Sequence, residues 1–134
     1  PGSDRHCQLG VGCRKGMSQA ALENAYAALL AEQNFAPEAF VQAASIDLKA
    51  NEPGLLAFCT SHGWELKTYA AEELSKLSGD FTPSPFVAQI TGVDNVCERA
   101  AVRASGGNLI RKKWKGAGVT FAVALAPVHF DWRW

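Results

Sequence analysis

Five stretches of the chain have the apolar pattern of β-strands. They are residues 7–11, 41–46, 64–69, 109–115 and 119–126. The first and third alternate apolar positions with polar or glycine positions, which is typical of strands. The second and fifth are mostly runs of apolar residues, which indicates burial on both faces. The fourth and fifth are joined by Gly116-Ala117-Gly118, so we expect a hairpin there.

Helical spacing fills the gaps between the strands. Residues 18–34 have an amphipathic pattern, and Ser18 can cap its start. A second helix follows Pro53 and is closed by Gly63. Its expected inward positions are Leu55, Phe58, Cys59 and His62. Residues 71–77 suit a short helix, and Ser84-Pro85 suits the start of a further turn.

The order of these elements predicts the topology. Each of the first three strands is joined to the next through a helix, so we expect them to be parallel. Asn95, with Glu98 three residues later, forms a capping box for one more helix, which ends at Gly106. The expected fold class is α/β, a three-layer α/β/α sandwich around a mixed five-stranded sheet, with three parallel strands and a C-terminal hairpin.

Length and composition are those of one ordered domain. The chain has 134 residues and is 48% hydrophobic, which suffices for a core without a metal or disulfide. We expect the domain to span residues 7–126, after a tag remnant and N-terminal tail at 1–6. No long apolar run or leader pattern occurs, so we expect a cytoplasmic protein without membrane contact. The aromatic tail at 127–134 offers a surface for self-association.

The four cysteines and three histidines show no metal-ligand spacing. We therefore expect reduced thiols, no metal site and no cofactor. Cys59 and Cys97 fall on inward helix positions and should be unreactive. Cys13 lies beside two cations at a helix start, which should favour its thiolate and make it the first to react.

The net charge of zero hides an asymmetry. Residues 1–98 hold 6 Lys or Arg and 12 Asp or Glu, a charge of −6, whereas residues 99–134 hold 7 and 1, a charge of +6. A basic stretch can mark a nucleic-acid or acidic small-molecule partner, but it can also be a solvated face. Trp114 is the lone aromatic in the run 111–115, which argues against a nucleic-acid partner.

Residues 9–18 have the composition of an anion-binding loop. Glycines allow a sharp turn, and the following helix start offers N–H donors with partial positive charge. Two adjacent cations suit a phosphate or carboxylate. The candidate ligand-binding residues are Gly12, Cys13, Arg14, Lys15, Gly16 and Ser18. Neither common phosphate-loop spacing is met, and glycines needed for packing alone are the alternative.

Polar residues also gather where the second strand ends. The candidates there are Asp47, Lys49, Asn51 and Glu52. Because the carboxyl ends of parallel strands meet at one edge of a sheet, this stretch and the first loop should be neighbours. If the strand from Leu109 runs the same way, the hairpin adds Lys113 and Lys115. We therefore predict that Arg14 and Lys15 join these lysines and Lys49 in one cationic rim.

Three motifs resemble a known family. Residues 10–16, 45–55 and 118–124 are similar to the three signatures of the CobE family, which is also found as the C-terminal domain of CbiG. The resemblance covers residues 7–126 and departs from the family pattern at Met17, Ala70 and Lys112. It implies a role in cobalamin biosynthesis, an α/β/α fold and a precorrin or corrinoid ligand. Other enzymes of the pathway are then possible partners.

Two hypotheses for function stay open. Corrin precursors are flat apolar rings fringed with carboxylates, so a receptor needs an apolar floor and separated cations. The first hypothesis is a protein that binds such an intermediate and holds or passes it between enzymes. The second is a precorrin hydrolase that opens a lactone, with Asp47 or Glu52 as base and Cys13 as a weaker nucleophile candidate.

Overall fold

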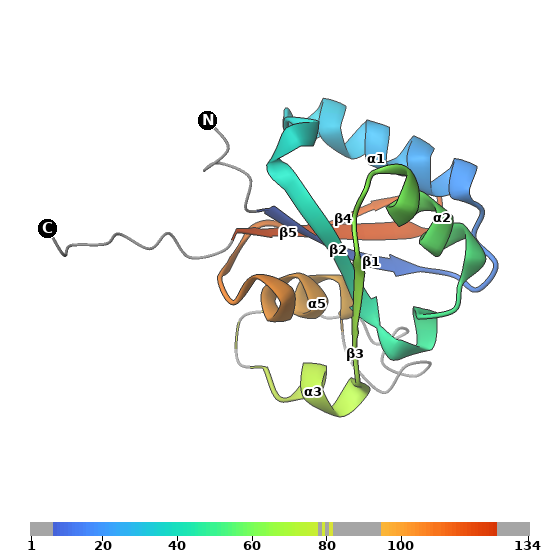
Figure 1. Cartoon of the computed structure of the whole chain (residues 1–134). Helices are drawn as coiled ribbons and strands as arrows, with labels where there is room; N and C mark the ends of the chain where they lie inside the picture. Colours follow the sequence, from blue (N-terminus) through green and yellow to red (C-terminus); the bar gives the residue numbers. More distant parts are fainter. Residues whose placement is uncertain (1–6, 78, 80, 82–94, 126–134) are drawn as a thin grey trace, which may run out of the picture.

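In the computed structural model, residues 7–77, 79, 81 and 95–125 are described. They form one five-stranded sheet with helices on both faces (Figure 1). The strands are β1 (Cys7–Cys13), β2 (Phe40–Ile46), β3 (Leu66–Tyr69), β4 (Asn108–Gly116) and β5 (Val119–Leu125). The helices are α1 (Gln19–Gln33), α2 (Pro53–Ser61), α3 (Ala71–Ser75) and α5 (Val96–Ser105), with 3₁₀ turns η2 (Pro37–Ala39) and η3 (Asp47–Lys49).

The sheet is mixed, as predicted. Its order is β3-β2-β1-β5-β4. β1 and β2 are parallel, and so are β2 and β3, whereas β5 is antiparallel to both β1 and β4. Two antiparallel steps make β4 run in the direction of β1. The carboxyl ends of β1, β2 and β3 therefore share one edge with the β4–β5 turn, and we call it the carboxyl edge.

Aromatic residues fill the face that α1 and α2 cover. Tyr26 of α1 contacts Phe40, Phe58, Trp64 and Phe121 edge to face, with ring centroids 5.3–6.4 Å apart. The first, second and last of these partners are also buried. Such rings bury much apolar area and add a preferred geometry to it. This cluster fixes how α1 and α2 lie on the sheet.

Small residues line the face that α5 covers. Cys97 and Ala101 of α5 pack against Ala122 and Ala124 of β5. Gly10 of β1 lies under the same helix, and a Cβ there would be 1.8 Å from the Cys97 carbonyl oxygen. Only glycine permits this approach of helix backbone to strand. Gly10 is therefore needed for packing, which was the alternative to anion binding for the glycines of residues 9–18.

Several boundaries differ from the sequence predictions. β1 continues to Cys13, so Gly10 and Gly12 lie inside a strand rather than in a turn. His62 is not within α2 as predicted but follows it as the C-cap; its ring nevertheless packs against Tyr26, Phe58 and Trp64, with centroids 4.6–5.1 Å apart. Of the three residues expected to form the hairpin turn, only Ala117 and Gly118 do, both with positive φ, as a two-residue turn requires. The turn after Ser84, the N-terminal tail and the aromatic tail lie outside the described residues.

Candidate functional site

Residues 14–18, which we call loop 1, connect β1 to α1 at the carboxyl edge. The Met17 N–H donates to the Arg14 carbonyl at 3.3 Å, and Gly16 has φ of 79°. A four-residue turn with positive φ at its third residue needs glycine there. Ser18 caps α1 by accepting the Ala21 N–H at 3.1 Å, as predicted. Arg14 and Lys15 are exposed on this turn.

Residues 47–52, which we call loop 2, are in direct contact with loop 1. The Gly16 N–H donates to Glu52 Oε1 at 2.8 Å. Gly54, two residues after Glu52, lies so close to Met17 that a Cβ would be 2.0 Å from the Met17 carbonyl oxygen. Glu52 occupies the N-cap position of α2 but makes no side-chain cap to it. Its carboxylate instead joins the two loops.

The environment of Cys13 contradicts the predicted activation of its thiol. Burial raises its pKa, Lys49 lowers it and Glu52 raises it. Burial is the largest of these causes, so the thiol form is favoured at neutral pH. Cys13 is nonetheless the only one of the four cysteines that is not buried. Between described residues, no hydrogen bond joins it to a histidine that could act as its base.

The two other thiols named from the sequence have the environment expected of unreactive groups. Burial raises the pKa of Cys59 to about 11, with a smaller contribution from Cys13. Burial likewise raises the pKa of Cys97 to about 12. Both cysteines are buried, and a buried thiol in an apolar setting is a poor nucleophile.

The hairpin turn touches loop 1 from the other side. A Cβ on Gly118 would lie 3.2 Å from Met17 Cε and 3.4 Å from Arg14 Nε. Lys115, just before the turn, is exposed. Lys113 is half-buried in a bulged part of β4, and its N–H donates to Glu98 Oε2 of α5 at 2.6 Å.

The structure therefore brings the backbones of loop 1, loop 2 and the hairpin turn together. Asp47 and Asn51 are exposed on loop 2, and Lys49 is half-buried there, near Cys13. Gly12 is covered by Thr120, whose Oγ1 would be 2.5 Å from a Cβ at that glycine. Ligand contacts by all these residues, and one continuous rim of cations, stay a prediction.

Two arginines of the basic stretch have a structural role that the sequence did not reveal. Arg99 donates from Nη1 to the carbonyl oxygens of Leu74 at 3.1 Å and Leu77 at 3.4 Å. Arg103 pairs with Glu73 and stacks on Tyr69, with its Cζ 4.9 Å from the ring centroid. These contacts hold α3 against α5. Local sequence patterns could not predict these contacts, because the carbonyl groups that Arg99 binds are over 20 residues away from it in sequence.

An open hollow of about 390 Å³ lies beside loop 2, and sequence reasoning missed it. It is lined by Ile46, Asp47, Leu48, Ala70, Ala71 and Glu72. Leu48 is 62% exposed, more than any other large apolar side chain among the described residues. The sequence feature that could have predicted this surface is Leu48, an apolar residue between Asp47 and Lys49 in a polar stretch.

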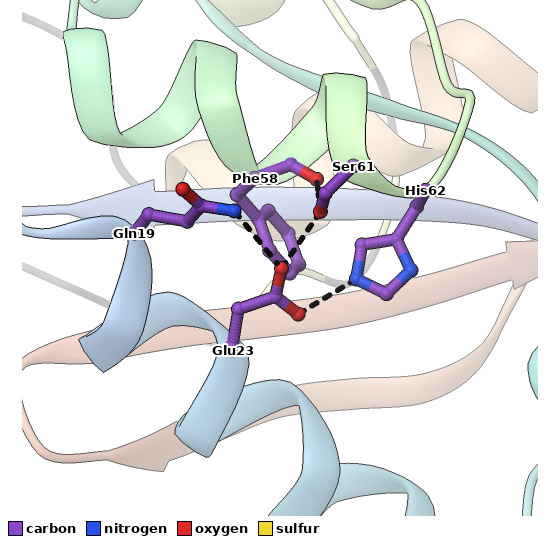
Figure 2. A network of polar contacts seen from close by, with 5 residues as sticks. All are labelled: Gln19, Glu23, Phe58, Ser61 and His62. Carbon is purple, nitrogen blue, oxygen red and sulfur yellow. Dashed lines mark hydrogen bonds and ion pairs between the residues drawn. The ribbon is translucent and has the colours of Figure 1, made fainter.

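A polar network lies away from these loops, between α1 and the end of α2 (Figure 2). Glu23 Oε2 accepts the Ser61 hydroxyl at 2.7 Å, and Glu23 Oε1 lies 2.8 Å from His62 Nε2. The carboxylate stands between serine and histidine, so the histidine cannot take the serine proton as it does in a catalytic triad. A second open hollow, of about 530 Å³, adjoins His62 and Trp64.

Among the described residues, no group of three or more His, Cys, Asp or Glu side chains is placed to hold a metal ion. None of the described helices has the length and apolarity needed to span a membrane.

Similarity to known proteins identifies the family. The family model described as "Cobalamin synthesis G C-terminus" matches residues 7–124. The chain belongs to this family. Its membership connects the chain with cobalamin biosynthesis, as the three sequence motifs predicted.

Two curated relatives are named cobalt-precorrin-5A hydrolase. The one from Priestia megaterium is 37% identical over 120 residues, and the one from Salmonella typhimurium is 32% identical over 117. These matches cover 89% and 87% of the chain but 32% and 33% of the relatives. The chain thus spans about a third of the length of the curated relatives it matches.

Solved structures of the family share the fold. CobE, described as a protein from the cobalamin biosynthetic pathway, is 27% identical, with a TM-score of 0.82 and 93% of each chain covered. The cobalamin biosynthesis protein chiG from Agrobacterium tumefaciens is 25% identical, with a TM-score of 0.67, covering 90% of this chain and 98% of its own. The α/β fold predicted from the sequence is confirmed.

Proposed function

We propose that this domain binds a polycarboxylate precorrin or corrinoid intermediate at the carboxyl edge and holds or passes it between enzymes of the pathway. The observation that carries the proposal is the contact of loop 1 with both loop 2 and the hairpin turn. Cation-bearing segments that are far apart in sequence thereby share one edge. Arg14, Lys15 and Lys115 are exposed there, within reach of a ligand fringed with carboxylates.

The energetics require several contacts at once. An exposed charge at a helix terminus contributes about 0.3 to 1 kcal/mol, whereas micromolar binding corresponds to roughly 8 kcal/mol. Loop 1 alone cannot supply this free energy. Further cations and burial of the ring must therefore contribute, which is why the neighbouring segments matter to the proposal.

The direct test uses dicyanocobyrinic acid, a corrin whose side chains end in free carboxylates, followed by its visible spectrum. Replacing Arg14 and Lys15 together by Gln should weaken binding by about tenfold at low salt and flatten its salt dependence. The control removes the same charge elsewhere, at Lys67 and Lys76, and should bind like the parent. Equal binding by both double variants would contradict a site at loop 1.

The hairpin is tested in the same assay. Replacing Lys113 and Lys115 by Gln should also weaken binding and flatten its salt dependence. Thermal stability should change little on replacing Lys115, because it is exposed and exposed charges contribute little to folding. Lys113 is half-buried, so the single variant Lys115→Gln is the control for any loss of stability in the double variant. If this variant binds like the parent at low salt, the hairpin is no part of the site, which is then confined to loops 1 and 2.

The second candidate function is hydrolysis of a precorrin ring. It is favoured by the similarity of the chain to two proteins named cobalt-precorrin-5A hydrolase. In this chain Asp47 is exposed and Glu52 is hydrogen-bonded to loop 1, so Asp47 is the better placed base for activating water. Incubation of the chain alone with cobalt-precorrin-5A, followed by mass analysis of the product, decides between the two. If the chain hydrolyses the substrate and Asp47→Asn abolishes this turnover, the hydrolase function replaces the binding function.

A further inference from the structure

Among the described residues, the most exposed large apolar side chain lies at the edge proposed for ligand binding. Leu48 belongs to η3 in loop 2, and it is 62% exposed. Its neighbour in the same turn, Lys49, is near the Cys13 thiol at the end of β1. A lone exposed leucine on a protein surface needs no explanation. Leu48, however, lies in the same turn as Lys49, a predicted anion-binding residue. A ligand held by Lys49 would therefore lie next to Leu48.

The hollow beside Leu48 continues this apolar surface. Ile46, Ala70 and Ala71 line it together with Leu48, at the carboxyl ends of β2 and β3. Among the described residues of the lining, Asp47 and Glu72 are the charged ones. An apolar floor with negative charges beside it repels carboxylates. The part of a polycarboxylate ligand that fits there is therefore its uncharged ring.

The strand order sets the distance between this floor and the cations. Neighbouring strands lie about 4.8 Å apart, and the order is β3-β2-β1-β5-β4. The hollow lies at the ends of β3 and β2, loop 1 follows β1, and the hairpin turn joins β5 to β4. The four intervals span about 19 Å along one edge. A tetrapyrrole with its side chains has a comparable width.

We propose that Leu48 and the adjoining hollow receive the ring face of the corrinoid, while the cations of loop 1 take carboxylates at its rim. This proposal rests on the proposed binding function and adds an orientation to it. Repulsion by Asp47 and Glu72 keeps the carboxylates away from the β3 end of the edge. The ring consequently lies over the β3–β2 end, and its carboxylates face β1 and the hairpin.

The test compares two exposed leucines in the full chain. Leu48→Ala should weaken binding of dicyanocobyrinic acid by about fivefold, because it removes apolar area that the ring would cover. Leu56→Ala is the matched control: Leu56 is 40% exposed on the neighbouring helix α2 and lies outside the hollow. It should bind like the parent.

The salt dependence separates a ring contact from a charge contact. The loss caused by Leu48→Ala should be the same factor at low and at high salt, whereas the loss caused by replacing Arg14 and Lys15 should shrink as salt rises. If the parent binds and the loop 1 variant binds more weakly, but Leu48→Ala binds like Leu56→Ala, the ring proposal is overturned and the proposed function stands. If the parent does not bind the corrinoid, both fall.

Discussion

The α1/α2 face of the sheet is packed with aromatic rings, whereas α5 packs on β1 and β5 through alanines, a cysteine and a glycine. On the first face Phe58 and Phe121 stack at 6.3 Å. On the second, Gly10 lets the backbone of α5 approach β1 more closely than any side chain would allow. Large rings bury more apolar area, and small residues give shorter distances between elements. We therefore expect the first face to contribute more to stability, whereas the second holds α5 and the Glu98 contact to β4 at a fixed distance.

The largest expected effect breaks the aromatic face. Phe58→Ala should lower the free energy of unfolding by about 3 to 5 kcal/mol, because Phe58 is fully buried and contacts several rings. Urea denaturation measures this loss. Leu56→Ala, on the exposed side of the same helix, should cost far less. Similar losses from both variants would show that α2 contributes through helix stability rather than through the rings.

The next effect breaks the α5 face without removing any atom. Gly10→Ala places a Cβ 1.8 Å from the Cys97 carbonyl oxygen and 2.9 Å from Ala101 Cβ, so α5 must move. We expect a loss of about 2 to 3 kcal/mol and faster amide exchange in α5. Gly106→Ala is the control, because Gly106 has φ of 66° and open space around it. Only backbone strain of about 1 to 2 kcal/mol applies there, and α5 should keep its exchange protection.

The smallest effect concerns the bridge between α1 and α2 in Figure 2. Burial raises the pKa of Glu23, but hydrogen bonds from Ser61 and His62, the charge of His62 and a hydrogen bond from Gln19 outweigh it and lower the pKa below 4.5. A depressed pKa in the folded state stabilises the fold above the unfolded pKa, and this stability is lost as pH falls through the folded pKa.

Glu23→Gln should therefore cost about 0.5 kcal/mol at neutral pH, a small value because the carboxylate is a third exposed to solvent. The difference from the parent should disappear below the folded pKa. Denaturation series at several pH values measure it. Glu38→Gln removes a charge from an exposed residue of η2 and serves as control. A constant difference at all pH values would mean that the bridge acts through packing alone.

Much of the fold followed from local patterns. The runs that became β2 and β5, the Ser18 and Asn95 caps and the hairpin turn each have a short-range cause in neighbouring residues. Strand direction followed from the intervening helices. What local patterns could not supply was the partner of each glycine. Gly10 is in close contact with α5, and Gly54 with loop 1, and both partners are far away in sequence.

The candidate site was predictable in part for the same reason. The meeting of loops 1 and 2 follows from parallel strands, and the structure shows that contact between Gly16 and Glu52. The roles of Arg99 and Arg103 did not follow, because charge alone does not tell a ligand contact from a tie to α3. Likewise Arg14 and Lys15 beside Cys13 suggested a reactive thiol, but the cation that lowers the pKa of Cys13 is Lys49, and burial outweighs it.

The pairing of Cys7 with Leu125 has a consequence for how such a domain is joined to others. These residues are register partners on β1 and β5, at the end of the sheet opposite loop 1. Any polypeptide attached before one or after the other thus arrives at the rear of the domain, and its two attachment points are a strand's width apart. The domain can therefore be joined to a longer polypeptide, such as the relatives of which it matches about a third, through the end of the sheet that lies opposite the carboxyl edge.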